Sequence, residues 1–286
     1  MKLVRSISLV LGAVLLSLAT IVLSSIPLIV LRRVGGSGYY WILSLMAGLV
    51  LVFSGHVALW APFLSIVILV GLYAELESNG FKIETAGLLS LAGTCTFVGL
   101  NLAALQNVSG LDLLPFVRDG VGQVVDRLQL MEPTLKLDVN TIVPQIPSAI
   151  VILLMFSLWI SLVVDRRLGL SATPAPELSQ FALPDFLVWV FLAGVVGSFV
   201  ELGDQAMRFA GQNLFNVMIY AYFLQGMAIV GTFFKVFKVG LFWRAFGYFV
   251  LIGQLFLLVS FVGFVDLWID IRRRLLKKSA ETMGEV

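Results

Sequence analysis

The sequence predicts an all-α fold: a polytopic bundle of transmembrane helices with about eight spans and one amphipathic interfacial helix. Two observations lead to this prediction. Of the 286 residues, 59% are hydrophobic and only 13% are charged, whereas an average soluble domain carries roughly 25% charged residues. The hydrophobic residues also gather in long runs, and a run of about 20 residues crosses a bilayer as a helix. We therefore expect residues 1–286 to form a single integral membrane domain.

Each expected span is an apolar window close to the roughly 17–25 residues that a spanning helix needs. In chain order the windows are residues 7–30, 39–55, 57–74, 85–105, 148–164, 186–202, 214–234 and 245–265. The second and third windows meet at Ser54-Gly55-His56 with almost no loop, which leaves seven spans as the alternative count. Lys2 and Arg5 precede the first window, as in a signal peptide. That window exceeds the apolar region of a signal, about 7–15 residues, so we expect a retained span.

One sizeable connector, residues 107–147, separates the fourth and fifth windows. Apolar residues recur in its first half at helical spacing; they are Leu114, Val117, Val121, Val124, Val125 and Leu128. Residues 111–130 hold two arginines and three aspartates, so attraction to anionic lipid explains this segment poorly. We expect a helix at the membrane interface that packs over the spans of its own chain.

The distribution of basic residues favours a cytoplasmic C-terminus, because cytoplasmic loops of membrane proteins are rich in lysine and arginine. Most of the excess lies in the tail, residues 269–286, which holds Arg272, Arg273, Arg274, Lys277 and Lys278. With a cytoplasmic C-terminus and eight spans, the loop that holds Arg166 and Arg167 would lie outside, against the usual distribution of positive charge. The orientation of the middle loops therefore stays open.

The chain has too few of the residues that catalysis or cofactor binding requires. His56 is the only histidine and Cys95 the only cysteine, so the sequence offers neither a zinc site nor a histidine-based triad. No glycine-rich phosphate loop of the GxxxxGK[ST] type is present. The net charge of +2 does not indicate a surface that binds nucleic acid. We therefore expect a protein that is not an enzyme, with no metal and no cofactor, and with the lipid bilayer as its partner.

The strongest candidate for a ligand site lies on the seventh window. Asn213, Asn216 and Tyr220 fall within about 60° of one another on a helix. Gln225 lies deeper on another face, and Gln254 on the last window could join them. Amide side chains in hydrocarbon need hydrogen-bond partners. Those partners are either other helices of the chain or a small molecule in a polar pocket, and both interpretations stay open.

The first window carries a stripe of small residues on one face, the kind of surface that lets two helices approach closely. It consists of Ala13, Ser17, Thr20 and Ser24. The helix that packs on this stripe belongs either to this chain or to another subunit. Near the other end of the chain, Asp266 lies close to an apolar window, so we expect it to pair with a cation inside the bundle.

Three segments of the second half resemble the YybS-like family of bacterial multi-pass membrane proteins. They are "FALPDFLVW" from Phe181 to Trp189, "YFLQGMAIV" after Asn213, and "GFVDLWIDIRRR". The closing motif of the family falls here on Gly263, Asp266, Trp268, Asp270 and Arg272. The resemblance is close over residues 181–274, and the preceding region agrees in the layout of its segments.

That family is in turn distantly similar to the substrate-binding subunits of energy-coupling-factor vitamin transporters. The resemblance implies a small-molecule-binding or transport subunit in the inner membrane of a bacterium, with an unknown ligand. It also implies that Ala13 and Ser17 contact a separate membrane subunit that couples transport to ATP hydrolysis. The alternative function is that of a structural or interaction subunit of a larger membrane complex.

Overall fold

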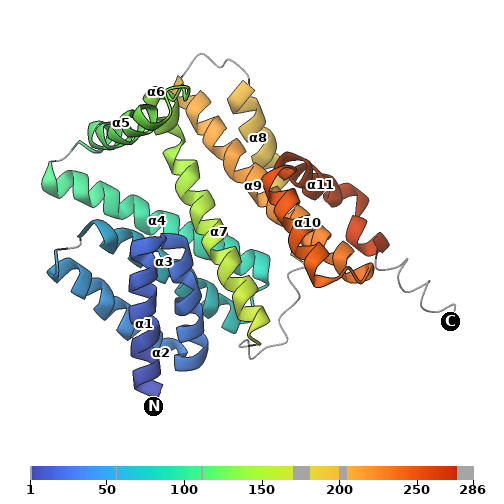
Figure 1. Ribbon diagram of the computed structural model, residues 1–286, viewed down its shortest axis with the longest axis horizontal. Helices are drawn as coiled ribbons and strands as arrows, with labels where there is room; N and C mark the ends of the chain where they lie inside the picture. The colour runs from blue at the N-terminus through green and yellow to red at the C-terminus, as the bar shows by residue number, and fades with distance from the viewer. Residues whose placement is uncertain (1, 56, 111, 170–180, 200–204, 276–286) are drawn as a thin grey trace. The chain divides into compact units, whose positions relative to one another are not determined.

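A computed structural model describes residues 2–55, 57–110, 112–169, 181–199 and 205–275. Every regular element in this described part is a helix (Figure 1), so the all-α prediction is confirmed. The sequence predicts one membrane domain, whereas the structure divides into two compact units, Met1–Pro174 and Ala175–Val286. We describe the two units in turn.

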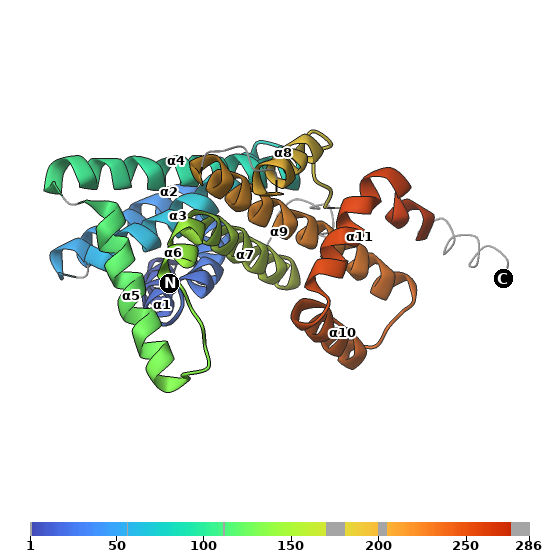
Figure 2. The same cartoon turned by 90° about the horizontal axis from the view of Figure 1, so that it is seen from above.

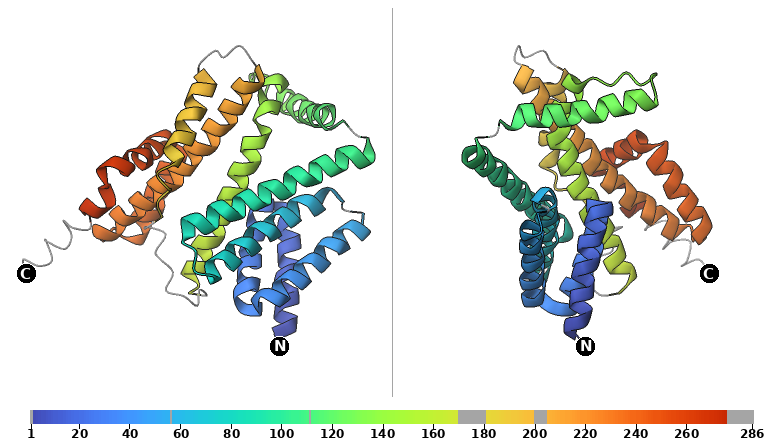
Figure 3. Two further views of the ribbon diagram at one scale, coloured as in Figure 1. Left: turned by 180° about the vertical axis from the view of Figure 1, so that it is seen from behind. Right: turned by 60° about the vertical axis from the view of Figure 1, so that its left-hand side comes forward.

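The helices of the first unit pack largely in chain order. They are α1 (Lys2–Ala19), η1 (Ile21–Ser24), α2 (Ser25–Phe53), α3 (Val57–Ser78), α4 (Ile83–Ser109), α5 (Leu113–Met131), α6 (Val139–Ile142), η2 (Val143–Gln145) and α7 (Ile146–Arg167). Each of α1, α2 and α3 packs on the next helix, and α7 returns to pack on α2, α3 and α4 (Figure 3). The core of this unit lies between α2, α3 and α7.

Two breaks divide the N-terminal apolar region in places that hydropathy does not reveal. α1 ends at Ala19, and Thr20 adopts an extended conformation before η1. The hydroxyls of Ser24 and Ser25 donate to the carbonyls of Ile21 and Val22, three residues earlier in each case. The second break lies inside α2, where Gly36 has φ 81° and ψ 175°, a backbone conformation that essentially only glycine adopts.

The second unit is built around one long helix, α9 (Gln205–Val236). Both α8 (Leu187–Phe199) and α11 (Phe256–Ile269) pack on α9, whereas α10 (Leu241–Gly253) packs on α11 (Figure 1). α9 and α11 cross in close contact, because a Cβ atom on Gly263 would lie 2.7 Å from the backbone nitrogen of Gly226.

The described residues contain five helices long and apolar enough to cross a membrane, so the predicted count of about eight spans is not confirmed. They are Ile21–Phe53, Leu59–Ser78, Ile83–Val108, Val139–Arg167 and Gln205–Val236. α10 and α11 are bent by 96° relative to one another. They would add a sixth span if the two helices form one broken span. Three predicted windows account for the difference. The first is cut at Thr20, residues 186–202 yield a helix of only 13 residues, and residues 245–265 are divided by the bend.

The predicted amphipathic helix is present as α5. Figure 2 shows α5 beside α6, and its principal contacts are with α6 and η2, the first residues of the candidate span Val139–Arg167. Val125 is the buried residue of this helix. The apolar face of α5 is therefore left largely open within its unit.

Candidate functional site

Six charged side chains from three helices meet in the first unit, and we call them the charge network. They are Arg32 and Arg33 of α2, Glu75 and Glu77 of α3, and Asp165 and Arg166 of α7. Three guanidinium groups thus face three carboxylates, and their formal charges cancel. The three helices that contribute them all belong to the candidate membrane spans.

Arg33 lies at the centre of the network and joins all three helices. Its Nε donates to both carboxylate oxygens of Asp165 at 3.2 and 3.1 Å, and its Nη2 donates to Oδ2 at 2.8 Å. The same Nη2 also donates to Glu77 on α3. The side chains of Asp165 and Glu77 are only 2% and 8% exposed. The guanidinium group of Arg33 therefore donates hydrogen bonds to two buried carboxylates at once.

The two glutamates of α3 have different sets of partners. Glu77 also accepts a hydrogen bond from the hydroxyl of Tyr73 at 3.1 Å, and Arg166 lies 3.8 Å away. Glu75 pairs with Arg32 at 3.1 Å. It also accepts hydrogen bonds from two side chains of α2, Ser37 and Trp41. Because Glu75 is one-third exposed at its side chain, the network extends from a buried centre to an accessible edge.

The break at Gly36 explains how these side chains come together. Arg32 and Arg33 precede the break, and Ser37 and Trp41 follow it, so both parts of α2 reach the end of α3. Gly71 of α3 permits this approach, because a Cβ atom there would overlap the rings of Tyr40 and Trp41. Tyr40 further fixes the pairing by donating its hydroxyl to the carbonyl of Val67 at 2.6 Å.

Sequence reasoning missed this network. Hydropathy windows place Arg32, Arg33 and Arg166 in loops and give no role to Glu77 or Asp165. A usable signal was present, since the segments "LRRVGG", "YAELES" and "VVDRR" each put charges at the edge of an apolar window. Which acid meets which base depends on the glycine break, and windows of hydropathy do not detect it.

The predicted ligand residues of the second unit do not gather in one place. Gln225 is 1% exposed and bonds to backbone at both ends of its amide. Its Oε1 accepts from the backbone N–H of Leu183 at 2.9 Å, and its Nε2 donates to the carbonyl of Gly263 at 3.0 Å. Gln254 is exposed at the bend after α10. Gln225 therefore bonds within its own chain, to α11 and to the segment before α8, and bonding within the chain is one of the two interpretations that the sequence left open.

The other members of the predicted stripe lie along α9. Asn213 donates to the carbonyl of Phe209 in the preceding turn at 2.8 Å, and Asn216 is half-buried. Tyr220 is buried, and its hydroxyl has no hydrogen-bond partner among the described residues. A buried hydroxyl without a partner is uncommon in proteins, so Tyr220 is the member of this stripe that best suits a ligand.

Residues of the closing motif bond to one another at the end of α11. Asp266 accepts from Arg272 through Nε at 3.0 Å and Nη2 at 2.8 Å, and from the backbone N–H of Ile271 at 2.8 Å. The predicted pairing of Asp266 with a cation is therefore confirmed. Asp270 ends the helix with φ 53°, and Arg272 donates to the carbonyl of Phe181 at 2.7 Å. Trp268 is largely exposed, as an interfacial anchor would be.

The predicted stripe of small residues is mostly enclosed within the first unit. Ala13, Ser17 and Ser24 are buried there, where α1 packs on α2, whereas Thr20 is exposed at the break. Lys277 and Lys278 of the predicted basic tail lie outside the described residues.

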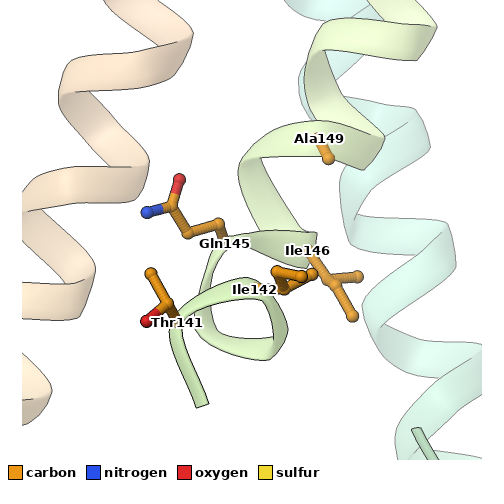
Figure 4. Close-up of a pocket in the computed structure, with 5 residues that line it drawn as sticks. All are labelled: Thr141, Ile142, Gln145, Ile146 and Ala149. Atoms are coloured by element: carbon orange, nitrogen blue, oxygen red, sulfur yellow. The ribbon is translucent and has the colours of Figure 1, made fainter. Parts of the chain in front are cut away.

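A separate pocket of about 350 Å³ lies where α6 leads into α7. Its lining consists of Thr141, Ile142, Gln145, Ile146 and Ala149. Figure 4 shows Thr141 and Gln145 extending to the same side of this segment. None of the five lining residues is ionisable, so this pocket is a weaker candidate for binding a charged ligand than the charge network.

The helices and their apolar windows define an integral membrane protein of the all-helical class. A family model described as "Predicted membrane protein (DUF2232)" matches residues 4–267. The chain belongs to this family of predicted membrane proteins. No curated protein and no solved structure is significantly similar to it.

Proposed function

We propose that this protein is a membrane-embedded subunit that binds a small charged molecule for transport. The observation that carries the proposal is the position of Arg33, Glu77 and Asp165, buried between helices of the membrane-spanning class. Ionisable groups inside a membrane protein are costly, and they typically mark substrate or ion pathways. The resemblance to substrate-binding subunits of energy-coupling-factor transporters supports the same function.

The break in α2 gives the proposal independent support. Transporters commonly form their binding sites where a spanning helix is interrupted, because the interruption frees polar backbone groups within the membrane. Gly36 interrupts α2 three positions after Arg33. Ser37 and Trp41, which follow the break, both donate hydrogen bonds to Glu75 of the network.

The network also indicates the class of ligand. A small solute with an amino or guanidinium group would compete with Arg33 for the carboxylates of Glu77 and Asp165, and charge-assisted pairs of this kind are strong and directional. The accessible edge at Glu75 and Arg32 is the side from which such a solute would enter.

A thermal-unfolding screen of the purified protein tests the proposal. The protein in detergent is screened against carboxylates, phosphates, zwitterions and cations. One class should raise the unfolding temperature of the wild type, since a ligand at 100 times its Kd stabilises by about 2.7 kcal/mol. The shift should persist in Glu84→Gln and disappear in Glu77→Gln, because Glu84 lies outside the network.

Two outcomes would overturn the proposal: no compound class shifts the wild type, or the shift is equal in Glu77→Gln. If Glu77→Gln does not fold, Arg33→Lys replaces it. That variant keeps the positive charge and loses the planar fork that holds Asp165.

The alternative is a structural subunit of a larger membrane complex, and one observation favours it. Gln225, the deepest of the predicted ligand residues, already bonds to its own chain at both ends of its amide. Crosslinking in native membranes followed by purification discriminates the two functions. A structural subunit should retain the same partner in fixed proportion whether or not a ligand is present, whereas a ligand-binding subunit should show the ligand-dependent shift.

A further inference from the structure

The amphipathic helix α5 presents an apolar face that its own unit leaves open. At about 100° per residue, the face spans roughly 120° of the helix. It consists of Leu113, Leu114, Val117, Val121, Val124, Val125, Leu128 and Met131. Leu114 is 67% exposed, Val124 57%, Leu128 41% and Met131 83%. A contiguous apolar surface of this kind marks a site of interaction with a membrane or a protein.

The opposite side of α5 carries exposed polar residues together with Phe116 and Leu130. Asp119, Gln123 and Asp126 are exposed there. Arg118 lies at one border of the apolar face and bonds to Asn140 at the start of α6, while Arg127 lies at the other border. Arginine side chains at such borders can extend their charged ends toward water while their stems cover apolar surface.

We propose that α5 lies flat in the membrane interface, with this apolar face inserted at the boundary between lipid headgroups and acyl chains. The position of α5 in the chain indicates that lipid is what contacts its apolar face. α5 follows α4, a candidate span that ends at Ser109 and turns at Gly110 with φ 62°. It precedes α7, whose candidate span begins at Val139. A helix held between the ends of two spans is kept at the membrane surface, where lipid is the adjacent apolar phase.

The charges of α5 indicate whether the helix prefers anionic lipid. Within the helix, Arg118 and Arg127 balance Asp119 and Asp126, and the N-cap residue is Asp112. Attraction to an anionic surface requires an excess of basic residues, which this helix lacks. Apolar burial therefore supplies the affinity, and α5 should insert equally into neutral and anionic membranes.

Site-directed spin labelling tests the proposal on the full-length protein. Cys95 is the only cysteine, so Cys95→Ser gives a background without native thiols, and its unfolding temperature is first checked against the wild type. Single cysteines then replace Val124 and Leu128 on the apolar face, and Asp119 and Asp126 on the polar face, as matched controls. Each labelled protein is reconstituted into vesicles of phosphatidylcholine, with and without phosphatidylglycerol.

The expected result is a several-fold higher ratio of oxygen to nickel-chelate accessibility at residues 124 and 128 than at residues 119 and 126, unchanged by phosphatidylglycerol. Equal nickel accessibility at all four positions would overturn the proposal, because α5 would then lie in water. Labels at 124 and 128 shielded from both reagents would also overturn it, since protein would then cover the face. Neither result depends on the charge network, so failure here leaves the proposed function untouched.

Discussion

At the scale of single residues, two buried polar side chains of the second unit, Gln225 and Asp266, are paired with partners outside their own helices. Gln225 connects the backbone of Leu183 and Gly263, and Asp266 connects Arg272 and the backbone of Ile271. In hydrocarbon an unpaired polar group costs several kcal/mol. These pairs therefore determine which faces of the helices can meet.

Replacing Gln225 by leucine should destabilise the protein. The N–H of Leu183 would stay buried without its partner, and such a group costs about 1–3 kcal/mol. Denaturant unfolding in detergent measures the loss. The matched control is Gln254→Leu, at an exposed glutamine, where a change within about 0.5 kcal/mol is expected. Equal stability of the two variants would show that the bonds of Gln225 contribute nothing.

Asp138 should make the start of α6 sensitive to acid. The backbone N–H of Asn140 and the hydroxyl of Thr141 donate to this exposed carboxylate and lower its pKa from the ordinary value of 3.8. A lowered pKa in the folded state means that the cap is fully formed above pH 3.8 and is lost as the pH falls through the folded value.

Hydrogen exchange at the amide of Asn140, corrected for its intrinsic pH dependence, checks this expectation. Protection should be constant above pH 3.8 and should fall below it. In Asp138→Asn, which keeps the capping oxygen without the titration, protection should be independent of pH over the same range. Acid loss of equal size in both proteins would contradict the assignment.

Some pairings could be predicted from the sequence and others could not. Asp266 and Arg272 are six positions apart, so the local chain already brings the cation near. Arg33 and Asp165 are 132 positions apart, and their pairing depends on the break at Gly36 and on the packing of α7. The apolar windows set the approximate position of the helices but carry no information about such register.

At the scale of elements, glycine determines how closely helices pack. The crossing of α9 and α11 depends on Gly226 and Gly263, whose missing side chains let the two backbones meet. Glycines at close crossings are typical of membrane helices, where packing and not water exclusion drives association. Composition identifies these helices as apolar, but the glycine pairs become visible only when the helices are placed together.

Gly263→Ala should disrupt this crossing. The added methyl group would overlap the carbonyl oxygen of Tyr222, and backbone cannot move aside as a side chain can. Overpacking of this kind costs about 1–3 kcal/mol, measurable as a lower unfolding temperature. Gly253→Ala is the control, because a Cβ atom there meets nothing within 4 Å. It should leave stability unchanged or raise it by up to about 1 kcal/mol. Similar effects of the two substitutions would refute the close crossing.

The number of spans is the element-scale property that hydropathy windows overestimate, with eight windows against five or six candidate spans among the described residues. A window counts apolar residues whether or not one straight helix contains them. Thr20 and the bend of 96° between α10 and α11 each divide a predicted span. A hydropathy scale carries no information about where the backbone leaves the helical conformation, as it does at Thr20.

At the scale of the whole molecule, we expect the C-terminus to lie in the cytoplasm. The basic residues Arg272, Arg273 and Arg274 follow α11, and positive charges are retained on the cytoplasmic side. A C-terminal fusion to a reporter that fluoresces only in the cytoplasm should be bright, and a fusion to a periplasm-dependent phosphatase should be inactive. Replacing the three arginines by glutamine should weaken this difference. The reverse pattern in the unmodified chain would place the terminus outside.

The most direct test of the proposed ligand site is native mass spectrometry of the protein released from its own membranes in mild detergent. We expect a bound small molecule, distinct from phospholipid, on the wild type and on Glu84→Gln, and its absence from Glu77→Gln at equal folded yield. A wild-type protein that carries no such molecule, or one that Glu77→Gln retains in full, would contradict a binding role for the charge network.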